Sequence, residues 1–265
     1  MPEPIDILAF SPHPDDAEIG CGGLLLLAAR QGLRTAIVDL TEGERATRGT
    51  PALRREEKRL AAERLGLAER RGLSLPDTAL GGAPDHEAAI VACLRTLRPR
   101  LVLAPWHEDR HPDHAEAARL IGRAAFFARV GKVGEGAPHR IERLLHYAIH
   151  AAIPPSLIVD VSSVWAARCE VLAAYRSQFL PSAEAGGAAT ALSDGGFLEV
   201  LEARSRHYGA MINVRHGEPY HADAPLAVDS AVSLLDPPGA AGAYGFSAVS
   251  LLDPPGAAGA YGSHR

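Results

Sequence analysis

Two short segments of the chain combine imidazoles with carboxylates. The segment AFSPHPDDAEIGCGG, residues 9–23, carries His13, Asp15 and Asp16, and the segment HEDRHPDH, residues 107–114, carries His111 and His114. Two histidines and one carboxylate with an open coordination position suit a catalytic Zn²⁺, whose bound water becomes a nucleophile near neutral pH. Together the two segments predict a hydrolytic zinc site.

The first segment offers His13 and Asp16 as metal ligands, and the second offers a third ligand. His111 and His114 are three residues apart and share one helix face if a helix begins with the intervening proline in its first turn. One of the two can bind metal while the other stays free. Asp113 in that first turn suits the positive helix terminus and would also orient a ligand histidine.

Hydrolysis also needs a proton acceptor for the water and a donor for the oxyanion that forms. Asp15 is adjacent to a ligand aspartate and would serve as general base if its carboxylate points elsewhere. We expect the spare imidazole, His111, to stabilise the oxyanion in its protonated form. On their own, the residues HPDD would be read as a capped turn, and only their combination with HPDH indicates catalysis.

Short apolar strands that alternate with longer helical patterns must position these segments. Strands are predicted at residues 5–10 and 35–41, with a crossover helix at residues 22–32 between them. The first acidic segment follows the strand at 5–10, and the second follows a predicted strand at 100–106. In a doubly wound sheet, two such strand ends flank the point where ligands bind. We therefore expect the metal site at the carboxyl ends of the first and fourth strands.

The rest of the chain continues this alternation and predicts an α/β, Rossmann-like, mostly parallel sheet with helices on both faces. The glycines at 20, 22 and 23 do not complete a dinucleotide fingerprint and instead indicate close packing of a helix on the sheet. The remaining predicted elements are helices at 51–65, 85–97, 164–179 and 197–210, and strands near 72–75, within 143–150 and within 156–162.

Composition excludes several classes of protein. The formal net charge is −5 and no long basic block occurs, which argues against a nucleic-acid partner. Cys21, Cys93 and Cys169 are too few and too widely spaced for a disulfide framework, so we expect packed thiols in a reducing cytoplasm. The apolar run at residues 24–29 is far shorter than the roughly 20 residues of a membrane span. These features predict a cytoplasmic protein with a small-molecule partner.

The C-terminal residues differ in composition from the rest. The sequence SAVSLLDPPGAAGAYG occurs at 230–245 and again at 247–262. It is too short for a solenoid and too poor in core-forming residues to pack alone. We therefore expect one domain at residues 1–225 and a flexible tail at 226–265.

The paired motifs PHPDDAEIGCGG and HPDH resemble those of the LmbE-like, or PIG-L, family of zinc-dependent N-acetylglucosaminyl deacetylases. The resemblance implies a Rossmann-like fold and one Zn²⁺ bound by His13, Asp16 and His114. It also implies Asp15 as general base, His111 as the group that stabilises the oxyanion, and a homo-oligomer.

Finer features resemble one branch of that family. The segments LTEGERATRGTPALRREE, residues 40–57, and EDRHPDHA, residues 108–115, resemble deacetylases of N-acetylglucosaminyl-malate in bacillithiol biosynthesis. Substrate contacts are then expected from Arg54, from Arg110, which would pair with a malate carboxylate, and from Asp77, which would accept hydrogen bonds from sugar hydroxyls. Without the resemblance, Arg54 reads as part of a solvated charged helix.

Other functions remain open at this point. A thiol-conjugate amidase, or a deacetylase of another N-acetylglucosaminyl conjugate, would use the same scaffold. A non-haem iron oxygenase would use the same ligand types, and a nucleotide-binding module would use the same fold. Glu18 has no role that the sequence supports. Six other histidines are unassigned, namely His139, His146, His150, His207, His216 and His221.

Overall fold

The computed structural model describes residues 3–180, 188–190, 192–193 and 196–225. All of them belong to one compact unit, Met1–Pro225. The tail that the sequence analysis set apart, residues 226–265, lies outside the described residues. None of the helices within the described ranges is both long and apolar enough to cross a membrane.

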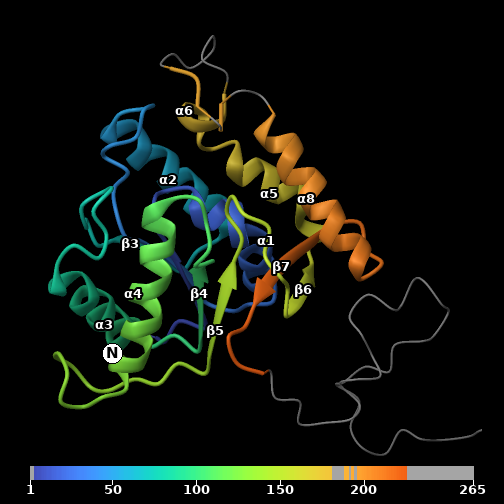
Figure 1. Cartoon of the computed structure of the whole chain (residues 1–265). Coiled ribbons are helices and arrows are strands. Elements are labelled where there is room, and N and C mark those ends of the chain that lie inside the picture. The colour runs from blue at the N-terminus through green and yellow to red at the C-terminus, as the bar shows by residue number, and fades with distance from the viewer. Residues whose placement is uncertain (1–2, 181–187, 191, 194–195, 226–265) are drawn as a thin grey trace, which may run out of the picture. The chain divides into compact units, whose positions relative to one another are not determined.

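A seven-stranded sheet forms the centre of this unit, in the order β3-β2-β1-β4-β5-β7-β6 (Figure 1). Neighbouring strands from β3 to β5 pair in parallel, and β7 runs antiparallel to both β5 and β6. This confirms the predicted mostly parallel sheet, although β7 was not predicted. The strands are β1 (Ile7–Ser11), β2 (Thr35–Asp39), β3 (Glu69–Gly72), β4 (Leu101–Pro105), β5 (Arg143–Tyr147), β6 (Leu157–Asp160) and β7 (Gly217–His221).

Helices cover both faces of the sheet. Leu8 and Phe10 of β1 belong to one apolar core with α3 and α4, and because side chains alternate along a strand, Ile7 and Ala9 face the opposite side. There α1 packs on β1 and against α5 and α2, while α8 packs on β7 (Figure 1). The helices are α1 (Asp16–Arg30), α2 (Pro51–Leu65), α3 (Pro84–Leu97), α4 (Pro112–Ala128), α5 (Trp165–Leu172), α6 (Arg176–Phe179) and α8 (Phe197–Met211), with a 3₁₀ turn, η1, at Ser162–Val164.

The first helix begins at Asp16 rather than at the predicted residue 22. Asp15 is therefore its N-cap residue, and Asp16 is its first residue. Ser11 at the end of β1 accepts a hydrogen bond from the backbone N–H of Ala17, which satisfies a donor of the first turn. A Cβ at Gly20 would overlap the Tyr147 ring, and one at Gly23 would overlap Val161 and the Glu218 carboxylate. These two glycines therefore allow the close helix packing that the sequence predicted.

Three further expectations need correction. The third strand is Glu69–Gly72 rather than 72–75. The helix expected at 164–179 is divided: η1 ends at Val164, α5 follows, and α6 begins only at Arg176. The break before α6 lies at Tyr175, where the backbone leaves the helical conformation and the hydroxyl donates to Glu18 Oε1 at 2.6 Å. Cys169 is exposed rather than packed, whereas the other two cysteines are buried.

Glu18 has a structural role that the sequence did not reveal. Its carboxylate is fully buried and forms an ion pair with Arg70 of β3, with Oε1 2.5 Å from Nη1. Arg70 also donates to both carboxylate oxygens of Asp39, at 3.0 and 2.8 Å. This paired network joins α1, β2 and β3 to the segment at Tyr175, and it lies outside the site described below.

We predict that Gly20→Ala lowers the free energy of unfolding by about 1–3 kcal/mol, because the new methyl group meets the buried Tyr147 ring. Gly22→Ala is the matched control, since its nearest neighbour would be Arg168 Cγ at an ordinary 3.7 Å. In a helix interior that change should be neutral or stabilise by about 0.5–1 kcal/mol. Urea unfolding measures both, and equal effects would contradict the packing argument.

Candidate active site

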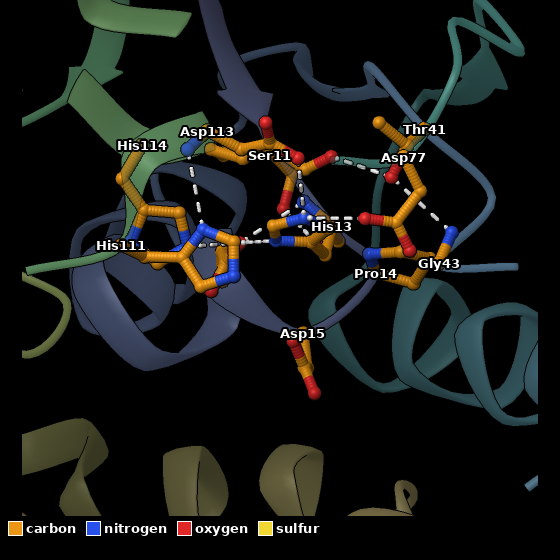
Figure 2. A network of polar contacts seen from close by, with 12 residues as sticks. Ser11, His13, Pro14, Asp15, Thr41, Gly43, Asp77, His111, Asp113 and His114 are labelled. Carbon is orange, nitrogen blue, oxygen red and sulfur yellow. Dashed lines mark hydrogen bonds and ion pairs between the residues drawn. The ribbon is translucent and has the colours of Figure 1, made fainter. Parts of the chain in front are cut away.

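The loops that carry the two acidic segments meet because β1 and β4 are neighbours in the sheet. The two strands pair in parallel, with Leu8 opposite Val102, so their carboxyl ends lie at the same edge. Here the strand order changes direction, since β2 lies on one side of β1 and β4 on the other. Figure 2 shows the result: the His13 side chain lies close to His111 and His114.

The three predicted metal ligands converge on one carboxylate oxygen. Asp16 Oδ2 is 3.0 Å from His13 Nδ1 and 3.1 Å from His114 Nε2. Burial works against the charge on Asp16, but the two imidazoles hold its pKa well below the usual range. One ionised carboxylate and two imidazole nitrogens form a donor set suited to Zn²⁺. The ring nitrogens of His13, His111 and His114 also lie within 4.8 Å of one another.

A second row of carboxylates contacts the other nitrogen of each ligand imidazole. His13 Nε2 is 3.3 Å from both Asp77 Oδ1 and Asp113 Oδ2. His114 Nδ1 is 3.0 Å from Asp109 Oδ1. Each ring thus has a carboxylate on both sides, and in this arrangement its nitrogens donate to them. With a cation bound on the Asp16 side, the outer carboxylates would keep the outer ring proton and leave the inner nitrogen as a ligand, as in metal sites where carboxylates orient ligand histidines.

Asp77 has a second possible part in the site besides the predicted contact with sugar hydroxyls. It lines the cavity described below, and its carboxylate also contacts His13 and accepts the backbone N–H of Arg45 at 2.9 Å. Asp77 is therefore also placed to orient the imidazole of a predicted metal ligand. Asp113 combines its contact with His13 with acceptance of the Thr78 N–H at 2.8 Å, in keeping with its expected orienting position.

Asp109 is a site residue that sequence reasoning missed. Its side chain is 1% exposed and accepts backbone N–H groups from His111 at 3.0 Å and His150 at 2.9 Å, in addition to the His114 ring. Although burial opposes ionisation, these donors hold its pKa below the usual range. The sequence offered one signal for this role. Asp109 lies two residues before His111, and an aspartate at that spacing commonly accepts the backbone N–H two residues on, in a local turn.

Asp15 differs from its neighbours because its carboxylate is buried without a full set of partners. Among the described residues, Oδ2 has no hydrogen-bond partner, and the nearest cation is Arg54 Nη2 at 3.5 Å. Burial raises the pKa of Asp15 to about 8, while Arg54 opposes this shift. Figure 2 shows Asp15 set apart from the three imidazoles.

The backbone at Asp15 is also unusual. Its φ of 114° lies in the region that disfavours side chains, and the carboxylate does not cap the helix that it precedes. A capped turn therefore does not explain why an aspartate stands at this position.

Arg54 is buried rather than solvated, and its Nη2 donates to the carbonyl of Pro14 at 2.5 Å. This contact fixes the chain next to Asp15, and backbone strain of this kind is common at functional sites.

His111 begins α4 as its N-cap residue. Its Nδ1 accepts the backbone N–H of Asp113 at 3.2 Å, so the ring proton lies on Nε2. Burial, together with the neighbouring His114 and His13, lowers its pKa. The expected group was a protonated imidazole, and the structure instead favours a neutral ring that donates through Nε2–H.

A cavity of about 330 Å³ opens over these groups. His150, which sequence analysis left unassigned, lines it and stacks on His114 with ring centroids 5.4 Å apart. Burial lowers the pKa of His150 to about 4. The two arginines predicted to contact substrate, Arg54 and Arg110, also line the cavity. Arg45 and Arg48 line it as well.

Comparisons with known proteins agree with these features. The model of the PIG-L family, described as GlcNAc-PI de-N-acetylase, matches residues 8–126, which include both acidic segments. A diacetylchitobiose deacetylase from Thermococcus kodakarensis is 32% identical over 189 residues, which are 65% of this chain and 70% of that protein. A probable N-acetyl-alpha-D-glucosaminyl L-malate deacetylase from Bacillus cereus is 26% identical and covers 65% of this chain and 83% of its own length.

Solved structures show the same similarity. A conserved protein from Thermus thermophilus is 38% identical, and the match covers 84% of this chain and 97% of that chain with a TM-score of 0.77. The match extends well past the family model, so the later strands and helices of the described unit share that fold as well.

We predict that Asp109→Ala weakens the affinity for added Zn²⁺ by about 10- to 100-fold, because His114, a predicted metal ligand, loses the carboxylate that contacts its ring. Glu108→Ala, at the exposed neighbouring position, should leave zinc affinity unchanged. His114→Ala should lose the metal altogether. Chelator competition measures affinity, and unaltered zinc binding in Asp109→Ala would show that this carboxylate does not orient a ligand.

Proposed function

Because the chain belongs to the PIG-L, or LmbE-like, family of deacetylases, we propose that it is a zinc-dependent hydrolase that removes the acetyl group from an N-acetylglucosamine conjugate. The products are acetate and a free amine. One observation carries this proposal: a convergent set of two imidazoles and one carboxylate lies next to a second, incompletely partnered buried carboxylate, Asp15.

In this proposal His13, Asp16 and His114 would hold the metal. A zinc ion bound there would supply Lewis-acid chemistry, namely a water of lowered pKa and polarisation of a carbonyl. The carboxylates behind the ligands, Asp77, Asp109 and Asp113, keep each imidazole in the tautomer that can bind a cation. The convergence of three donor atoms supports this ligand set.

Asp15 acts as the proton carrier. Its Oδ2 takes the proton of the water that adds to the acetyl carbon, and the same proton passes to the nitrogen when the carbon–nitrogen bond breaks. Arg54 holds the adjacent backbone carbonyl and thereby keeps the Asp15 carboxylate in place. His111 donates its Nε2–H to the acetyl oxygen as negative charge develops there.

For the substrate we favour N-acetylglucosaminyl-malate, as in bacillithiol biosynthesis. The similarity to a Bacillus cereus protein described as a probable deacetylase of that compound supports this choice. The cavity adds a chemical reason, because Arg45 and Arg110 are exposed side chains on its wall and guanidinium groups pair well with carboxylates. A neutral aglycone would leave this positive charge without a counterpart.

The zinc-loaded protein should release acetate from N-acetylglucosaminyl-malate, and a chelator should abolish that release. Zinc added back should restore it. Amine formation measured with and without chelator tests both parts. Turnover that requires oxygen and a co-substrate would favour an iron oxygenase instead, and cleavage of a thiol conjugate without deacetylation would favour an amidase.

We expect Asp15→Asn to lower kcat by about 10²- to 10⁴-fold while zinc is retained, because the amide cannot accept the proton of the attacking water. Asp85→Asn, at an exposed position at the start of α3, provides the matched control and should retain full activity. Acetate release and elemental analysis of the same preparations separate loss of the base from loss of metal. Unchanged turnover in Asp15→Asn would remove this residue from the mechanism.

A further inference from the structure

A second cavity, of about 280 Å³, adjoins the one over the proposed catalytic residues. Arg110 and His150 line both cavities and form the partition between them, with Arg110 Nη2 3.5 Å from His150 Nδ1. Each cavity alone lies near the lower limit of typical ligand sites, and the two together fall within the usual range. A ligand that fills both must pass Arg110 and His150.

One wall of this second cavity is apolar and comes from the first turns of α8. Phe197, Val200 and Leu201 line it together with Ile149 from the segment after β5. Val200 is 63% exposed, although burial of an apolar side chain is favourable in free energy. Phe197 packs edge-on against His150, with ring centroids 6.4 Å apart, so the apolar wall continues from the partition.

The same cavity is positively charged. Arg204 donates to the carbonyls of Ile149 and Ala148, which are neutral acceptors. Arg110 is exposed, and within the described part of the chain no carboxylate forms an ion pair with it or with Arg204. Two guanidinium groups beside an apolar wall are complementary to a ligand that has a negative charge and a hydrophobic body.

We propose that the second cavity is an aglycone subsite for an anionic aglycone with an apolar body. This inference rests on the deacetylase function proposed above. The sugar ring occupies the first cavity, and the aglycone extends past Arg110 and His150 onto Phe197 and Val200. Malate supplies the negative charge but has almost no apolar surface, so it fills the cavity only in part. An aromatic carboxylate meets both requirements.

Four N-acetylglucosamine glycosides that differ only in aglycone test this assignment with the zinc-loaded full chain: methyl, malyl, phenyl and 4-carboxyphenyl. Acetate release gives kcat and KM for each. We expect the 4-carboxyphenyl glycoside to have a kcat/KM about tenfold above that of the malyl conjugate, mainly through a lower KM, because binding far from the reacting bond is common to ground and transition states. The phenyl and methyl glycosides should rank below it.

Val200→Glu places a carboxylate on the wall of the proposed subsite. It should reduce the ratio of kcat/KM for the 4-carboxyphenyl glycoside to that for the methyl glycoside by about tenfold, through repulsion of the anionic aglycone. Leu198→Glu is the matched control, because Leu198 is 46% exposed on the same helix and does not line the cavity. That variant should leave both values unchanged.

The outcomes separate the subsite from the reaction. Equal kcat/KM for all four glycosides, or an equal loss on the methyl and 4-carboxyphenyl glycosides in Val200→Glu, would overturn the subsite while the deacetylase function stands. Acetate release from none of the glycosides would instead contradict the proposed function. A selective loss in Val200→Glu that is absent from Leu198→Glu supports the subsite.

Discussion

The contact of Asp16 with two imidazoles is the interaction on which the rest of the site depends. A buried carboxylate is unfavourable unless cations or hydrogen bonds compensate it, and His13 before α1 and His114 in the first turn of α4 provide that compensation. The parallel pairing of β1 with β4 brings those two segments together, and the close approach of α1 at Gly20 keeps the helix that begins at Asp16 against the sheet. Further carboxylates then hold the outer nitrogen of each ring.

The same arrangement explains why a cation suits this site. Asp16 contacts both imidazoles, Asp77 and Asp113 contact His13, and Asp109 contacts His114, so four carboxylates surround two rings. Despite burial, contacts with the aspartates raise the pKa of His13 to about 12 and that of His114 to about 9. A divalent ion would supply the positive charge that the protons otherwise provide, and each ring would then be neutral with its lone pair toward the metal.

Local signals in the sequence were sufficient for the parallel strands β1, β2, β4 and β5, for α2 at Pro51–Leu65 and for the meeting of the two acidic segments. They were insufficient wherever tertiary contacts decide the conformation. The strand β7 contains Gly217 and Pro219 and forms because β5 and β6 pair with it on both sides. In the sequence, Asp109 and His150 look like ordinary loop residues. They meet only because the segment after β5 folds back onto the segment after β4, and hydrophobic periodicity does not predict that contact.

Chemistry and selectivity are located on different parts of this fold. The groups proposed for metal binding and proton transfer lie where β1 leads into α1 and where β4 leads into α4, and parallel strands and carboxylate contacts hold them closely there. The second cavity instead uses the start of α8, where Leu201 is buried but Val200 is exposed. Because an exposed side chain contributes little to the core, a substitution at Val200 can change the aglycone accepted without disturbing Asp16 and its two imidazoles. Such a division allows related chains with the same acidic motifs to act on different conjugates.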